Sequence, residues 1–175
     1  MIQQLVVRQW QIADAEELQA AIIESREHLK PFMPWAEAAA AMDIVQRREF
    51  VAGWMTNQEE RNFGIWRGAR LVAVMGLHAR IAPDGIEIGY WVRASEINRG
   101  IATFGARELT KIAFMDPAIT HVEIHHDSAN LASGRVPEKL GYTFIVELDR
   151  EPDAPSASGK HKIWRVSREE WAKND

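Results

Sequence analysis

The sequence predicts an α+β domain with a mixed, mostly antiparallel central sheet flanked by helices. Segments with strand and helix patterns follow the order β-α-α-β-β-β-α-β-α-β-β along the chain. Short turns join the three middle strands, which favours an antiparallel meander, and helices separate the later strands, which favours right-handed crossovers. With 175 residues, 46% of them hydrophobic, the chain is long enough to bury one core. We therefore expect a single domain over residues 1–175.

The first part of the chain is expected to hold one strand and two helices. LVVRQW at 5–10 has a strand pattern, and Asp14 opens a helix that is expected to end near Ser25. Two prolines then predict an irregular loop over residues 28–40. A second helix, capped by Asp43, is expected to end near Asn57. Its expected buried side consists of Ile44, Phe50, Val51 and Trp54.

The remaining elements are delimited by turn and helix-stop residues. Gly68 and the Pro-Asp-Gly turn at 83–85 join the strands of the meander, and Gly141 is a usual helix terminator. We expect, in order, strands at 62–66, 71–79 and 86–92, a helix at 100–115, a strand at 121–126, a helix at 132–140, strands at 142–149 and 161–166, and a brief helix capped by Ser167.

The composition argues against several classes of protein. Without cysteine the chain has no disulfide and no thiolate nucleophile, which fits a cytoplasmic protein. A net charge of -4 argues against a general nucleic-acid binder. No apolar run approaches the length of a membrane span, and the first residues lack the pattern of a secretory signal. We expect a cytoplasmic monomer or homodimer without nucleic-acid or membrane partners.

The stretch EIGYWVRASEINRGIATFGA, residues 87–106, is the most informative in the chain. It runs from an apolar strand through a polar loop into the first turn of a helix. The N–H groups of that turn have no partner inside the helix and lie at the positive end of its dipole. Gly100 and Ala102 are small enough to let a diphosphate approach the main chain. The pattern favours an anion seat at residues 98–103, although an ordinary start of a helix has the same pattern.

This stretch, the KPFMPW loop after the first helix, and HVEIHHDSANLASGRVPEKLGY at 121–142 together resemble the GNAT family of N-acetyltransferases. The resemblance covers nearly the whole chain and points to the branch of ribosomal-protein N-terminal alanine acetyltransferases. It implies a GNAT-like domain with a splayed strand pair. It also implies an enzyme that transfers an acyl group from acetyl-CoA to a primary amine in a ternary complex.

The acetyl-CoA motif of that family, Gln/Arg-x-x-Gly-x-Gly/Ala, falls on residues 97–102. Gly100 and Ala102 match it, whereas Ile97 replaces the polar or basic first residue. Phosphate binding by backbone N–H groups tolerates this change. The resemblance implies coenzyme contacts from Asn98, Arg99, Gly100, Ile101, Ala102 and Thr103.

Acyl transfer to an amine needs a base, an oxyanion donor and an acid for the departing thiolate. The resemblance implies that the backbone near Tyr90, Trp91 and Val92 supplies the oxyanion donor. Glu87 is the candidate base, with a solvated carboxylate at a strand end as the alternative.

Asn130 and Ser133 match the family pattern, which implies contacts with the pantetheine arm and the coenzyme sulfur. Their alternative role is an ordinary pair at the start of a helix. Many relatives carry a tyrosine acid seven residues after the asparagine, and this chain has Pro137 there. Ser133 or a water is then the candidate acid.

The resemblance places the loop that ends at Trp35 beside the acceptor channel. Trp35 is the candidate aromatic wall, or else a plug between the first two helices, and Glu37 is placed to attract an ammonium group. His121 and His125 share a strand face from which His126 points away, so we expect no metal site there.

The expected function is transfer of an acetyl group from acetyl-CoA to a primary amine, with a protein or peptide N-terminus as first choice. A small amine such as a polyamine, an amino-acid derivative or an aminoglycoside is the alternative acceptor. A degenerate acyl-CoA-binding module without turnover is a second alternative, because Ile97, Asn98 and Pro137 depart from the family pattern.

Overall fold

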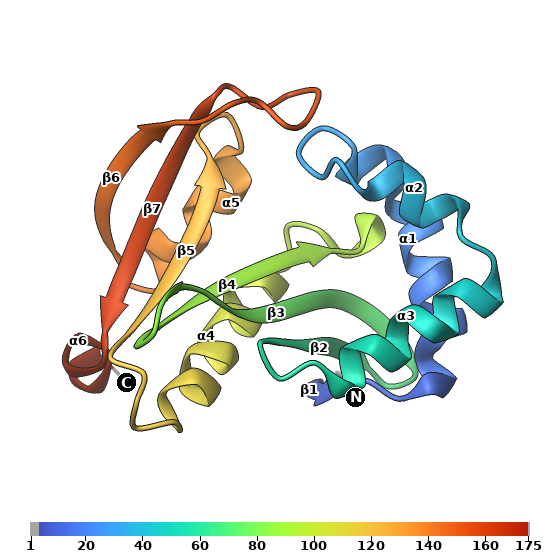
Figure 1. The fold of residues 1–175 in the computed structure, drawn as a ribbon, viewed down its shortest axis with the longest axis horizontal. Helices are drawn as coiled ribbons and strands as arrows, with labels where there is room; N and C mark the ends of the chain where they lie inside the picture. The colour runs from blue at the N-terminus through green and yellow to red at the C-terminus, as the bar shows by residue number, and fades with distance from the viewer. Residues whose placement is uncertain (1–3, 175) are drawn as a thin grey trace.

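The computed structural model describes residues 4–174, so residues 1–3 and 175 of the expected domain lie outside the described ones. One seven-stranded sheet has the strand order β1-β2-β3-β4-β5-β7-β6 (Figure 1). Its strands are β1 (Leu5–Gln9), β2 (Glu60–Arg67), β3 (Arg70–Ala82), β4 (Gly85–Val92), β5 (His121–Asp127), β6 (Thr143–Asp149) and β7 (Lys160–Ser167). The helices are α1 (Ala15–Leu29), α2 (Ala36–Ala41), α3 (Ile44–Thr56), α4 (Ile101–Phe114), α5 (Leu131–Lys139) and α6 (Arg168–Asn174).

The sheet confirms the predicted mixed, mostly antiparallel fold. Each of the strands β1 to β4 pairs antiparallel with the next one along the chain. Helix α4 then connects β4 to β5, and these two form the one parallel pair among the described strands. β7 then lies between β5 and β6 and pairs antiparallel with both.

The parallel pair is joined over only three residues of each strand. Gly85–Glu87 pairs with His121–Glu123, and beyond Glu87 and Glu123 no further partners join the two strands. Figure 1 shows β4 and β5 diverging from this point, so the predicted splayed pair is present. The two strand ends therefore form the walls of a wedge.

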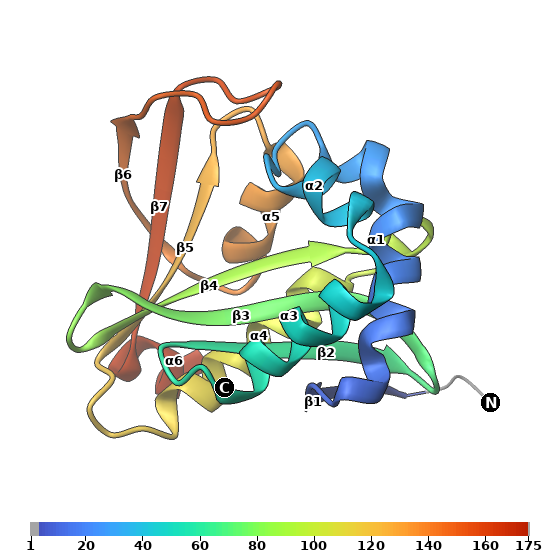
Figure 2. The same cartoon turned by 45° about the vertical axis from the view of Figure 1, so that its right-hand side comes forward.

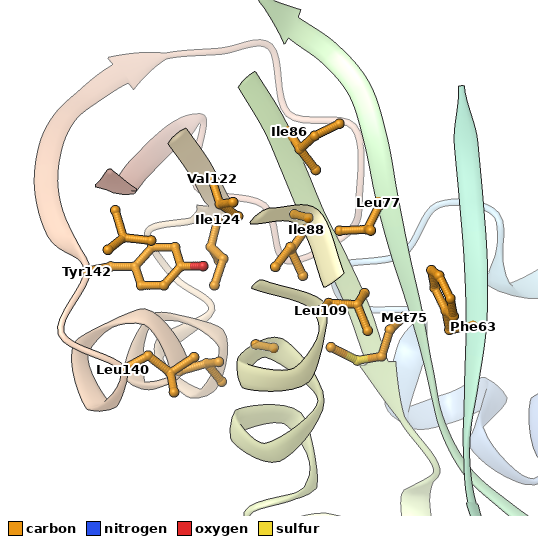
Figure 3. Close-up of a cluster of buried hydrophobic side chains, with 14 of the residues drawn as sticks. Phe63, Met75, Leu77, Ile86, Ile88, Leu109, Val122, Ile124, Leu140 and Tyr142 are labelled. Carbon is orange, nitrogen blue, oxygen red and sulfur yellow. The ribbon is translucent and has the colours of Figure 1, made fainter. Parts of the chain in front are cut away.

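Two hydrophobic cores hold the sheet between its helices. Helix α4 covers one face and packs on β3 and β4, while α1 and α3 cover the other face of β2 and β3 (Figure 2). Figure 3 shows the α4 core, which includes Phe63, Met75, Leu77, Ile86, Ile88, Leu109, Val122, Ile124, Leu140 and Tyr142. Gly105 lets α4 approach the sheet closely, because a Cβ there would lie 2.4 Å from the Ile65 side chain.

The predicted irregular loop over 28–40 is wrong in part. The first helix continues past Ser25 to Leu29, whose side chain is buried, and the alanine-rich segment after Trp35 forms α2. Alanine is the strongest helix former, and Ala36 and Ala39 gain further stability by packing into the second core. Only the short segment around the two prolines is irregular.

The expected burial of Phe50 is also wrong. Its side chain is 40% exposed, because the buried stripe of α3 runs through Arg47 and Val51. Phe50 lies at the margin of that stripe, against the half-buried Trp54. No helix in the described part of the chain is both long and apolar enough to cross a membrane.

Candidate active site

A cleft of about 500 Å³ opens on the sheet face that carries α1 to α3. Its walls come from the α1–α2 region, from α3, from the splayed ends of β4 and β5, from the start of α5 and from the 150–159 loop. Trp35, Glu87, Tyr90, Trp91, Asn130 and Ser133, all predicted from the sequence, line this one cleft.

The predicted anion seat lies beyond the end of β4, at the start of α4. Asn98 and Gly100 both have left-handed backbone conformations, with φ angles of 60° and 73°. No atom lies within 4 Å of the position that a Cβ on Gly100 would occupy, so the turn faces open space. Ile101 is buried and can offer only its backbone, whereas Ala102 and Thr103 are half-buried.

Arginine side chains surround this turn. Arg67 bonds to the buried Glu96 at 2.6 Å, and Arg99 lies 3.4 Å from the same carboxylate. The Arg99 side chain is 58% exposed, so it is free to contact a bound anion. Unpaired helix N–H groups, an open glycine turn and an exposed guanidinium together fit a diphosphate.

Tyr90 and Ser133 meet across the wedge. The Tyr90 phenol lies 3.0 Å from the Ser133 carbonyl oxygen, to which it donates, and 3.1 Å from the Ser133 hydroxyl. Burial raises the pKa of Tyr90 well above its ordinary value, so the phenol keeps its proton at neutral pH. The sequence predicts a role for the backbone near Tyr90 and none for its phenol. No local signal connects two side chains that are so distant in the chain.

Asn130 is the N-cap of α5. Its side chain accepts a hydrogen bond from the Ser133 backbone N–H at 3.2 Å, which is the ordinary structural role. Asn130 also lines the cleft, so this structural role is compatible with the predicted contact to the coenzyme.

Glu87 is a buried carboxylate held by Arg80. The guanidinium donates to both carboxylate oxygens, at 2.9 and 2.7 Å. Burial alone would raise the pKa of Glu87, but the Arg80 bonds and the nearby His125 outweigh it and hold the pKa below its ordinary value. An ion-paired carboxylate of this kind accepts a proton poorly.

His125 lies between two carboxylates and is a candidate that the sequence analysis missed. Its Nε2 is 2.5 Å from a Glu123 oxygen, and its Nδ1 is 3.6 Å from a Glu87 oxygen. The contact depends on the pairing of β4 with β5, which sets Glu87 opposite Glu123. No group of three or more metal-ligating side chains was found among residues 4–174.

The two predicted acceptor residues differ in position. Trp35 is 39% exposed and lies with its ring 6.2 Å from that of Trp91, at the cleft wall. Glu37 is 62% exposed, sits 3.7 Å from Arg26 and 3.5 Å from Lys30, and is not among the described residues that line the cleft. Val92 packs against the α4 core and likewise does not line it.

Residues 4–143 match a family model described as an acetyltransferase (GNAT) domain. The chain is 25% identical over 174 residues to YdaF of Bacillus subtilis (strain 168), whose name assigns it provisionally as a ribosomal N-acetyltransferase. That match covers 95% of this chain and 93% of YdaF.

Two solved structures illustrate the likeness of the fold. RimL, the ribosomal L7/L12 alpha-N-protein acetyltransferase in complex with coenzyme A, superposes with a TM-score of 0.84 at 16% identity, over 95% of each chain. RimJ of Mycobacterium smegmatis, solved with a CoA-disulfide, gives a TM-score of 0.80 at 21% identity, over 95% of this chain and 83% of RimJ.

Proposed function

Because this chain belongs to the GNAT acetyltransferase family and is an acyl-CoA-dependent N-acyltransferase, we propose that it acetylates the N-terminal amine of a protein or peptide from acetyl-CoA. The observation that carries the proposal is the wedge where β4 and β5 part, between an open glycine turn and a cleft lined by aromatic and ionisable side chains. The relatives named as ribosomal-protein acetyltransferases support the choice of acceptor.

The donor would bind with its diphosphate at the start of α4. The backbone N–H groups of Ile101, Ala102 and Thr103 belong to the first turn of α4 and have no acceptor within the helix. Arg99 adds a charged donor. The acyl arm would then run along the wedge toward Tyr90 and Ser133.

The oxyanion donor would be a backbone N–H of β4. Beyond Glu87 the edge of β4 that faces β5 has no strand partner in the described residues, so its N–H groups are available near Tyr90 and Trp91. Such fixed donors stabilise the charge that develops on the thioester oxygen.

The departing thiolate would take its proton from Ser133. Ser133 would take a replacement proton from the Tyr90 phenol, 3.1 Å from its hydroxyl, and solvent in the cleft would reprotonate the phenolate, because the raised pKa of Tyr90 favours the protonated form. This pair would serve in the place of the tyrosine acid that Pro137 replaces.

Deprotonation of the acceptor ammonium would use Glu87 together with His125. Arg80 makes Glu87 a weak base on its own, and an imidazole takes a proton at neutral pH more readily than an ion-paired carboxylate. Glu123 holds the ring so that Nδ1 faces Glu87. In its neutral form His125 would take the proton at Nδ1, and Glu87 would orient the incoming amine.

Release of free thiol from acetyl-CoA tests the proposal. Peptides with a free N-terminal alanine or serine should be acetylated, and the same peptides with a blocked N-terminus serve as the matched control. Acetylation of the α-amine is verified by mass spectrometry. Faster turnover of polyamines or aminoglycosides than of every peptide would contradict the assigned acceptor, and the absence of turnover with any amine would contradict catalysis.

A further inference from the structure

Arg47 is a buried guanidinium without a carboxylate partner. Its side chain is fully buried, at 0% exposure, and no carboxylate of the described residues lies within ion-pair distance. Its Nε donates to the Gln19 side chain at 2.8 Å and one Nη donates to the Ala39 carbonyl at 2.5 Å. The other Nη is buried and has no hydrogen-bond partner.

The other buried arginine, Arg93, shows what is missing. Arg93 is 4% exposed and donates to two carboxylates, Glu17 at 2.6 Å and Glu24 at 2.7 Å. Burial lowers the pKa of Arg47, with no charge to oppose it, whereas the carboxylates outweigh burial and raise the pKa of Arg93. A buried charge that is unpaired destabilises the folded protein, so Arg47 calls for an anion that the chain itself does not supply.

Arg47 also borders the cleft. It lines the same hollow as Met33, Trp35 and Trp54, on the opposite face of the sheet from α4. Phe50 lies over the guanidinium, with its ring centroid 5.3 Å from the central carbon, and is itself 40% exposed. Arg47 is therefore a buried charge at the border of the cleft, beside a partly exposed ring.

We propose that Arg47 binds a carboxylate of the acceptor, so that the enzyme selects amines that carry an acidic group. The inference deepens the proposed function and rests on it. The coenzyme phosphates are not the anion, because their predicted seat is the start of α4, on the other face. Two sources share the required chemistry: an Asp or Glu side chain close to the N-terminus of a peptide, and the carboxylate of a small amino-acid derivative.

Peptide pairs that differ only in this group provide the test. Each pair has the same N-terminal alanine and length, with Asp or Glu in one peptide and Asn or Gln in the other. The acidic peptide should have a kcat/KM about 10-fold higher, which corresponds to about 1.4 kcal/mol. Arg47→Met, which keeps a long apolar side chain, should abolish the preference while the KM of acetyl-CoA stays the same.

Arg48→Met is the matched control. Arg48 is the neighbouring residue on α3, half-exposed and paired with Glu16, and it does not line the cleft. Removing its charge should leave the preference for the acidic peptide unchanged. If this variant loses the preference as well, a general charge effect explains the result and the assignment of Arg47 falls.

If Arg47→Met fails to fold, calorimetry on the wild-type protein provides a second test. It measures the affinities of the acidic and the amide peptide in the presence of coenzyme A. Equal affinities for the acidic and amide peptides overturn it, even if the peptides are acetylated, and the proposed function then stands alone. A small amino-acid derivative could bind only when it carries its carboxylate, while no peptide binds. That result would support the carboxylate site at Arg47 and contradict the peptide acceptor.

Discussion

At the scale of single residues, the contacts with chemical consequence join side chains that are far apart in the sequence. Tyr90 meets Ser133, and His125 meets Glu87, each across the gap between β4 and its neighbours. Polar groups in such a wedge are shielded from water, so their hydrogen bonds fix which atom holds each proton.

Ser133→Ala should lower kcat by about 10- to 100-fold while coenzyme binding stays nearly intact, because the lost interaction is made mainly in the transition state. Tyr90→Phe should lower kcat in the same way. If the two hydroxyls act as one relay, the double variant should be no slower than Ser133→Ala alone. Unchanged kcat in Ser133→Ala would make the residue structural, and additive losses would contradict the relay.

The buried side chain of His126 should make the folded protein less stable in mild acid. Its Nδ1–H donates to the Asp127 carbonyl and its Nε2 accepts from the Trp164 indole, so the buried ring is held neutral. Burial lowers the pKa of His126 below its ordinary value of 6.5. The unfolded chain therefore binds the proton more readily, and stability present above pH 6.5 is lost as the pH falls from that value through the lower pKa of the folded state.

The expected result is a lower Tm at pH 5.5 than at pH 7.5, with a smaller difference in His126→Gln. The exposed His28→Gln should keep the wild-type difference and is the control. Burial also lowers the pKa of His78 and His161, so part of the dependence should remain. An unaltered pH dependence in His126→Gln would exclude His126 as a source.

At the scale of elements, the proposed phosphate seat and the proposed acceptor wall each depend on how a helix begins. The turn at Asn98 and Gly100 starts α4 with left-handed residues and leaves its first N–H groups exposed. The proline-held loop before α2 places Trp35 against Trp91. Each element would thus present a surface to one of the two proposed substrates.

Gly100→Glu should abolish binding of acetyl-CoA, because it places a carboxylate in the open space of the turn. Gly100→Ala is the control. It has the same unfavourable φ of 73°, at a cost of about 1 kcal/mol, but adds no charge. Calorimetry on both folded variants decides. Retained affinity in Gly100→Glu would rule out this turn as the phosphate seat.

Trp35→Ala should raise the KM of the acceptor far more than the KM of acetyl-CoA, because the ring forms part of the cleft wall. Phe144→Ala, which removes a comparably exposed aromatic ring from β6, should change neither constant. Equal changes in both constants for Trp35→Ala, or a change in thermal stability alone, would show that the ring serves packing.

At the scale of the whole molecule, one sheet would carry both proposed substrate sites. Helix α4 covers one face and begins beyond the end of β4, where the phosphate seat is proposed, while α1 to α3 cover the other face, beside the proposed acceptor cleft (Figure 2). The pairing of β4 with β5 stops at Glu87 and Glu123, and Tyr90 meets Ser133 beyond that point. Donor and acceptor would therefore meet at the wedge from opposite sides.

The sequence by itself determined the strands and nearly all helices, because burial on one face leaves a period that is readable along the chain. It also determined the glycine turn before α4 and the cap of α5, since both depend on residues close together in the chain. It failed at α2 and Phe50. Alanine propensity outweighed the preceding prolines at α2, and the orientation of α3 depends on its neighbours.

Only the tertiary structure decided how these elements meet. The insertion of β7 between β5 and β6, and the short β4–β5 pairing, follow from sheet packing that no local pattern encodes. The β4–β5 pairing sets His125 between two carboxylates, and the packing of α1, α2 and α3 leaves Arg47 buried without one. Charge partners are chosen by proximity in space, so the ionisation of the site depends on the fold and cannot be read from residue types alone.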